Sequence, residues 1–160
     1  MRFVLIDRID RLEPGRRAEG HKQVSPDEDY FRDHFPGYPI VPGVIVLESL
    51  AQLGGRLVEA TVRDASGRRV LPVLARVDHA KFLQPVRPGD RLDLEVGLAA
   101  LSEDAARVTG TARVAGRRAA SAEIMYAVLD TAQGARLDET QAAALHDWSD
   151  RIWQELRGDR

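Results

Sequence analysis

Residues 34–52 read HFPGYPIVPGVIVLESLAQ, a proline- and glycine-rich loop that runs directly into a long apolar segment. Proline suits the first turn of a helix, where its missing N–H would have no partner, so Pro42 and Gly43 mark a helix start. We predict a helix from about Gly43 to Arg63, with apolar residues on nearly all sides through Leu53. Because a helix that is apolar all round is normally buried, this one should form the centre of the fold.

Two adjacent glycines, Gly54 and Gly55, interrupt the predicted helix. Each costs about 1 kcal/mol relative to alanine in a helix interior. The pair indicates that the helix backbone packs closely against a sheet or a partner helix, and a kink is the alternative.

The same stretch contains two side chains that suit catalysis. His34 lies on the stiff loop, and Glu48 follows 14 residues later (48 − 34) inside the apolar run. Taken singly, the histidine would most often be a surface or packing residue, and the glutamate would be an interface residue as often as a functional one. However, an ionised carboxylate is costly to bury, so Glu48 must be paired, protonated or used in a reaction. Gln52 is one helical turn further on, where it can orient the carboxyl group. An imidazole and a buried carboxyl are the groups that two-residue acid–base catalysis requires.

The rest of the chain predicts an antiparallel sheet. Strand patterns bounded by turn residues cover residues 3–12, 16–24, 70–77, 92–98, 107–114 and 119–129. Residues 26–32 predict a short helical turn with Ser25 as its N-cap. Short connections imply antiparallel pairing, and the one long apolar helix must be covered by the sheet. The expected fold class is therefore α+β, with the sheet wrapped around the central helix.

Residues 131–160 form a C-terminal helical extension to the domain predicted for residues 1–130. Asp138 and Gln141 have the spacing of a capping box, which predicts a helix start. A narrow apolar stripe follows, made by Leu145, Trp148, Ile152 and Leu156. We expect this helix to dock on the domain or on a second subunit.

Composition limits the class of protein. The chain has 160 residues, which fits one domain, and it has no cysteine, which excludes disulfides, thiolate metal sites and a cysteine nucleophile. Asp7 and Asp10 interrupt the region where a signal peptide would need an apolar core, and Glu48 and Arg56 interrupt the longest apolar run. We therefore expect a cytoplasmic protein without a membrane span. A net charge of −2 gives no general attraction to nucleic acid.

The 34–52 stretch resembles the HFPG-x-P-x-x-PGV…E-(A/S)-(M/L)-AQ signature of the hot-dog-fold 3-hydroxyacyl-[acyl carrier protein] dehydratases of the FabZ type. A second block, residues 80–82 followed by 85–90, resembles the KF-x-x-PV-x-PGD stretch of that family. The resemblance covers about residues 1–130 and implies a hot-dog fold. Asp33 stands where the family often has glycine, and the extension lies outside the family core. Both departures favour a specialised member, such as one of a polyketide-type or aryl-polyene-type pathway.

The resemblance also implies roles for individual residues. His34 matches the catalytic histidine, Glu48 the catalytic acid, and Gly43 the glycine whose N–H binds the thioester carbonyl. Dehydration needs a base for the C2 proton and an acid for the leaving C3 hydroxyl, and these two side chains suit those tasks. Glu rather than Asp at position 48 favours the FabZ type over the FabA dehydratase-isomerase type. The remaining substrate-binding candidates are Val44, Phe82 and Gln52.

The implied partners are a second subunit and an acyl carrier protein. Family sites combine His and Glu from different subunits, which implies a homodimer or a higher oligomer (a dimer of dimers or a trimer of dimers). Carrier proteins are acidic, so the tunnel mouth should be basic. The candidate docking residues are Lys81, Arg87 and Arg91, with Arg56 and Arg63 late on the helix. We expect no metal or other cofactor, since a His/Glu pair has too few ligands for a metal.

Two alternatives stay open on the sequence alone. One is a non-catalytic acyl-binding hot-dog subunit, although such a role needs no buried acid. The other is an acyl thioesterase, although the thioesterases of this fold do not follow the HFPG…E pattern.

Overall fold

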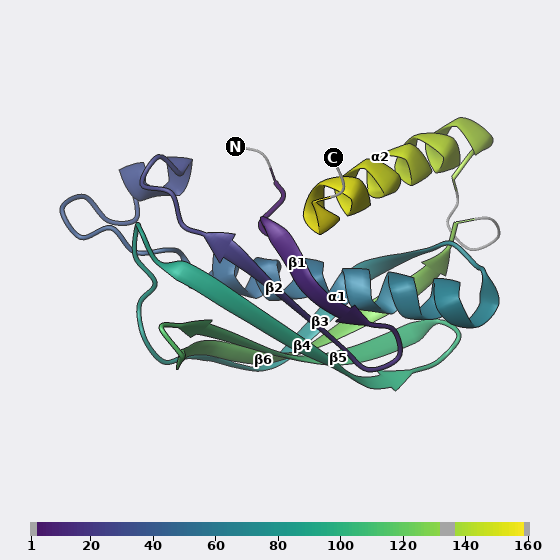
Figure 1. Cartoon of the computed structure of the whole chain (residues 1–160), viewed down its shortest axis with the longest axis horizontal. Coiled ribbons are helices and arrows are strands. Elements are labelled where there is room, and N and C mark those ends of the chain that lie inside the picture. The colour runs from purple at the N-terminus through teal and green to yellow at the C-terminus, as the bar shows by residue number, and fades with distance from the viewer. Residues whose placement is uncertain (1–2, 132–136, 159–160) are drawn as a thin grey trace.

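The computed structural model describes residues 3–131 and 137–158, and it has one antiparallel six-stranded sheet with the strand order β1-β2-β4-β5-β6-β3 (Figure 1). The strands are β1 (Arg8–Glu13), β2 (Arg17–Gln23), β3 (Val70–Phe82), β4 (Arg91–Leu101), β5 (Ala105–Val114) and β6 (Arg117–Asp130). The helices are the 3₁₀ helix η1 (Asp29–Arg32) and the α-helices α1 (Gly43–Ser66) and α2 (Glu139–Arg157). The α+β prediction, with the sheet around one central helix and a helix at the C-terminus, is confirmed.

Helix α1 packs along the sheet and supplies much of the core. Its side chains Leu50, Leu53 and Leu57 are fully buried, together with Val108 and Ile124 of the strands that it crosses. Full burial of each such side chain contributes roughly 1.5–3 kcal/mol. The helix continues to Ser66, three residues beyond the predicted end (66 − 63), and Gly67 then closes it in the left-handed conformation at φ 69°.

The glycine pair in α1 has the explanation that the sequence favoured. A Cβ on Gly54 would collide with the Tyr126 hydroxyl and would lie 3.2 Å from Val108 Cγ1. Only a residue without a side chain lets the helix approach β5 and β6 so closely. A Cβ on Gly55 would make ordinary contacts at 3.9 Å, so the close-packing prediction holds for Gly54.

The first strand is shorter than predicted, because it begins at Arg8 and not at Phe3. The preceding segment bonds to the central helix, where Leu5 N–H donates to Gln52 Oε1 at 2.8 Å. Leu5 and Ile6 are also buried there, so both faces of this segment are taken up before a ladder can form. Ser25 accepts from Asp27 N–H at 3.2 Å and caps a turn, while η1 begins four residues later.

Strand β3 is longer than predicted and lies at an edge of the sheet. Its pairing with β6 shifts register between Asp78 and Lys81, where His79 adopts φ 52°. Such a bulge lets a strand bend and continue, which is why the pattern that ended at Val77 extends to Phe82.

Helix α2 starts with the predicted capping box: Gln141 N–H donates to Asp138 Oδ1 at 2.8 Å, and Asp138 N–H donates to Gln141 Oε1 at 3.1 Å. Figure 1 shows α2 beside β1 and α1, outside the sheet. The four side chains of the predicted stripe all line one cavity, although Trp148 is 43% exposed, and Trp153 of the same helix is buried as well. Among the described residues, no helix is both long and apolar enough to cross a membrane.

Candidate active site

The loop that carries His34 is closed by its own backbone. His34 N–H donates to the carbonyl oxygen of Tyr30 in η1 at 3.0 Å, and Ile40 N–H donates to His34 O at 3.1 Å. Between these bonds, Tyr38 N–H donates to Phe35 O at 2.9 Å and Gly37 adopts φ 78°. The loop is therefore a small, internally bonded unit, as its prolines and glycines predicted.

The imidazole of His34 is oriented by one hydrogen bond. Its Nδ1 lies 3.0 Å from Ile40 O, and a carbonyl oxygen only accepts, so Nδ1 is the donor. In the neutral ring, Nε2 is then the nitrogen with the free lone pair. Within the part of the chain that the structure describes, Nε2 has no hydrogen-bond partner. This is the arrangement of a general base.

The start of α1 lies beside this histidine. His34, Gly43, Val44 and Phe82 line one cavity of about 540 Å³. The first N–H groups of a helix have no partner within the helix, and those of Gly43 and Val44 have none among the described residues. A Cβ on Gly43 would lie 2.8 Å from the Phe82 ring, so a side chain there would have to displace the exposed ring. Free N–H groups beside an apolar cavity are suited to a developing oxyanion.

Glu48 lies in the next turn of α1 and is oriented by Gln52. The Gln52 amide nitrogen donates to Glu48 Oε1 at 3.0 Å. Gln52 is itself held by the N-terminal segment, where it accepts from Leu5 N–H at 2.8 Å and donates to Phe3 O at 3.3 Å. Because Oε1 of the carboxyl accepts from Gln52, Oε2 is the oxygen left to carry or donate a proton.

Tyr126 is a neighbour of Glu48 that the sequence did not single out. Its hydroxyl donates to Ala51 O at 2.7 Å. Burial raises the pKa of Tyr126, and the negative charge of Glu48 raises it further. The tyrosine therefore stays neutral and supports the α1 backbone next to the carboxyl. Its inward place in the alternating β6 was the one available signal.

Glu48, Gln52 and Tyr126 line a second cavity of about 270 Å³. Among the described residues, none lines both this cavity and the one at His34. The structure thus brings together His34 with Gly43, Val44 and Phe82, and Glu48 with Gln52. It leaves these two groups apart within one chain.

The basic residues predicted to bind a carrier protein differ in whether their side chains already have partners. Arg91 pairs with Asp93 at 2.7 Å and with Asp10 at 3.5 Å, and its hydrogen bond to Asp93 raises its pKa. Arg87 lies 4.5 Å from the Tyr38 ring centre and donates to its hydroxyl at 2.6 Å, which braces the His34 loop.

The two late-helix arginines are tied to one buried acid. Arg56 and Arg63 bond to Glu59 at 2.9 and 2.8 Å. Burial lowers the pKa of Arg56, and the Glu59 carboxylate opposes that shift.

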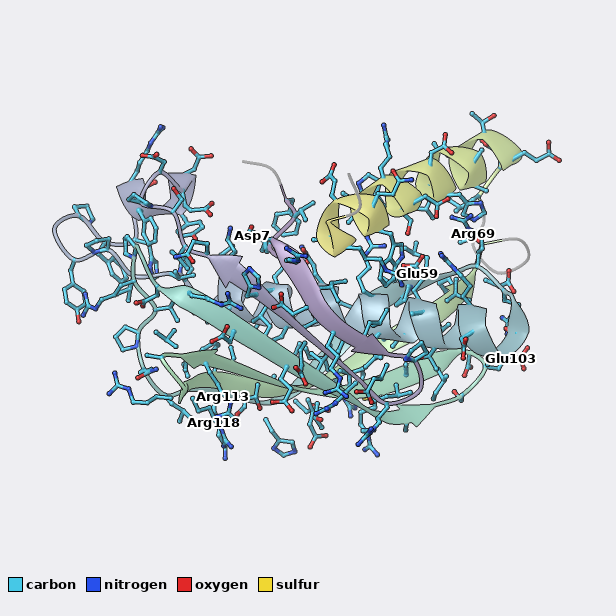
Figure 2. All side chains as sticks on the ribbon, in the orientation of Figure 1. Asp7, Glu59, Arg69, Glu103, Arg113 and Arg118 are labelled. Carbon is cyan, nitrogen blue, oxygen red and sulfur yellow. The ribbon has the colours of Figure 1, made fainter. Side chains whose placement is uncertain are left out.

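A basic group that the sequence did not single out lies at the turn between β5 and β6. It consists of Arg113, Arg117 and Arg118, and Figure 2 shows Arg113 and Arg118 together at one end of the sheet. Arg113 and Arg118 are register partners, while Ala119 and Ala120, next along β6, line the His34 cavity. Exposed Lys81 is on the neighbouring strand, in register with Ser121. Among the described residues, none of these four cations has an ion-pair partner.

No group of three His, Cys, Asp or Glu side chains in the described part of the chain is arranged to hold a metal ion. The candidate groups are the His34 imidazole and the helix N–H groups at one cavity and the Glu48 carboxyl at the other.

An antiparallel sheet around one helix, with a loop histidine at the helix start and a carboxyl inside the helix, defines a protein of the hot-dog fold. The family of FabA-like domains matches residues 1–123, and the chain belongs to that family. The 3-hydroxyacyl-[acyl-carrier-protein] dehydratase FabZ of Chloroflexus aggregans is 46% identical over 128 residues, which are 80% of this chain and 87% of that protein. The FabZ of Pelotomaculum thermopropionicum is 43% identical over 126 residues, 79% of this chain and 88% of that protein.

Among solved structures, the dehydratase heterocomplex ApeI:P of Xenorhabdus doucetiae is similar, with a TM-score of 0.63 and 17% identity over 89% of this chain and 88% of that one. At this identity the likeness shows the fold alone. Together, the comparisons confirm the FabZ-type resemblance and the hot-dog fold.

Proposed function

We propose that this protein removes water from 3-hydroxyacyl-[acyl carrier protein] and releases trans-2-enoyl-[acyl carrier protein], in fatty-acid or polyketide-type biosynthesis. The FabZ relatives, at 40–46% identity over most of both chains, confirm the dehydratase prediction. The observation that carries the chemistry is the bond from His34 Nδ1 to Ile40 O, which leaves Nε2 as a base on the wall of a cavity.

In the proposed reaction, His34 Nε2 takes the C2 proton and the C2–H electron pair forms the C2–C3 double bond. The C3–O bond breaks, and the leaving hydroxyl takes a proton from Oε2 of Glu48 and departs as water. The C2 proton then returns from His34 to the Glu48 carboxylate. Negative charge that develops on the thioester oxygen is stabilised by the free N–H groups of Gly43 and Val44. Gln52 keeps the acid in one orientation throughout.

The site that we propose is shared between two copies of this chain. Within one chain, His34 and Glu48 line separate cavities, so one copy alone holds only half of the acid–base pair. Strand β3 is an edge with exposed apolar side chains Val73, Leu74 and Phe82, which suits pairing with a second copy. We therefore propose a homodimer, alone or within a larger assembly, in which His34 of one protomer meets Glu48 of its partner.

The carrier protein is proposed to dock at the basic group of the β5–β6 turn. Lys81, Arg117 and Arg118 are exposed, have no ion-pair partner among the described residues, and adjoin the wall of the His34 cavity. An acidic carrier would thus meet unpaired cations at the place where its acyl thioester must enter.

The test is turnover of 3-hydroxyacyl thioesters by purified protein, followed in both directions between the hydroxyacyl and enoyl forms. His34→Ala should abolish the reaction, and Glu48→Gln should lower kcat by about 10²-fold, since each removes a proton-transfer group. Asp33→Asn, next to the histidine but outside the acid–base pair, is the matched control and should stay active. Release of free thiol would instead identify a thioesterase, and absence of any turnover would favour a non-catalytic subunit.

A further inference from the structure

Helix α2 forms one wall of the cavity that contains Glu48. Four apolar side chains of α2 line this cavity: Leu145, Trp148, Ile152 and Leu156. Across the space lie Gly55 of α1 and Leu71 and Leu74 of β3. The family match ends at residue 123, whereas α2 begins at Glu139, so this wall lies outside the matched part of the chain.

Polar contacts hold α2 in place over α1. Buried Glu59 of α1 accepts from the Ser149 hydroxyl at 2.9 Å, and Arg56 donates to the same hydroxyl at 2.8 Å. A buried carboxylate that has several donors is costly to leave unpaired, so these bonds resist separation of the two helices. Figure 2 shows Glu59 between α1 and α2.

Two further contacts fix α2 to the start of β3 and the end of β6. Arg69 bonds to Asp150 at 2.7 Å, and His146 Nε2 lies 2.8 Å from the Thr131 hydroxyl. Figure 2 shows Arg69 under the same helix. The wall is therefore positioned along its length by polar bonds as well as by its apolar stripe.

The proposed reaction, on which this inference rests, determines what enters the cavity. Glu48 protonates the hydroxyl on C3, so C3 lies against the carboxyl. Because the proposed site is shared, the thioester end lies toward His34 and Gly43 of the other protomer, which line its cavity of about 540 Å³. The acyl tail from C4 onward must then extend past Glu48 into the adjoining space. That space measures about 270 Å³, just below the roughly 300 Å³ at which ligand sites usually begin, so it fits a compact acyl group.

We propose that α2 determines acyl-group specificity, with Leu145 as a side chain that limits the length of the tail accepted beside Glu48. Leu145 lines the cavity, is only half-buried, and makes no polar contact in the described residues, so its size can be changed without loss of the bonds that anchor α2.

The experiment compares kcat/KM for pantetheine thioesters of four-, eight- and twelve-carbon 3-hydroxyacyl groups. Leu145→Ala should raise the long-to-short ratio by about tenfold, and Leu145→Phe should lower it by a similar factor, as expected for pockets that differ by a few methylene groups. The four-carbon substrate should be turned over equally by all variants. Gln154→Ala, exposed on the same helix and outside the cavity lining, should leave the ratio unchanged.

Opposite shifts of the long-to-short kcat/KM ratio in the two Leu145 variants support the inference, because a general loss of folding would lower kcat/KM for all three substrates together. Equal ratios in wild type, Leu145→Ala and Leu145→Phe would overturn it while leaving the dehydratase assignment intact. A wild-type protein that dehydrates none of the three substrates would overturn the proposed function and this inference with it.

Discussion

Mixing two inactive variants should restore activity if the site is shared between protomers. In one chain, His34 and Glu48 line different cavities, so we expect each complete site to combine His34 of one protomer with Glu48 of its partner. His34→Ala removes the proposed base, and Glu48→Gln removes the proposed acid. In a mixed dimer of the two variants, one site has both substitutions and the other has neither.

The size of the effect follows from two-fold symmetry. Equal amounts of the two variants, exchanged to equilibrium, give about half mixed dimers, each with one intact site of two, so activity should recover to about a quarter of wild type. The assay is hydration of an enoyl thioester by the mixture after reversible unfolding or co-expression with two different tags. The double variant His34→Ala/Glu48→Gln, mixed with wild type, is the control for subunit exchange.

A mixture that stays as inactive as either variant alone, although mixed dimers are isolated through both tags, would refute the reasoning. It would mean that His34 and Glu48 of the same chain act together, or that one of them is not catalytic.

Two other outcomes are expected. The double substitution Arg117→Glu with Arg118→Glu should raise KM for carrier-bound substrate severalfold and leave KM for small thioesters unaffected. The increase should become smaller as salt rises, because screening weakens the electrostatic attraction between the two proteins. Equal losses of activity on both substrates would show a structural role instead. Gly54→Ala should lower the free energy of unfolding by about 1–3 kcal/mol, because its methyl group collides with the Tyr126 hydroxyl, and chemical denaturation measures this; Gly55→Ala, where a Cβ makes ordinary contacts, is the matched control and should change stability far less.

Local signals predicted the elements of the fold well wherever the pattern and its ends were both encoded nearby. The helix start at Pro42–Gly43 and the capping box of Asp138 and Gln141 depend on residues within one turn, and both are as expected. Errors arose where distant residues compete for the same backbone. The N–H of Leu5 donates to Gln52 and not to a neighbouring strand, so the first strand begins later than predicted. A bulge in the pairing with β6 lets β3 continue to Phe82.

The family was also identifiable from the sequence. A histidine in a stiff loop and a carboxyl in an apolar helix, within 14 residues (48 − 34), were enough to identify it and to propose an acid–base pair. The orienting bond from Gln52 to Glu48 was predictable too, because helical spacing places residues i and i+4 on one face.

Only the tertiary structure determines which of these side chains line the same cavity. Helix α1 presents Gly43 to one cavity and Glu48 to another, and no spacing rule states that His34 lines only the first. Likewise, a stripe on residues 139–157 predicts that a helix docks, but not that it docks over Glu59 and closes the cavity at Glu48. The physical reason is that periodicity determines which face of an element is buried, whereas the partner of that face is determined by long-range packing and by bonds between residues that are about 90 positions apart.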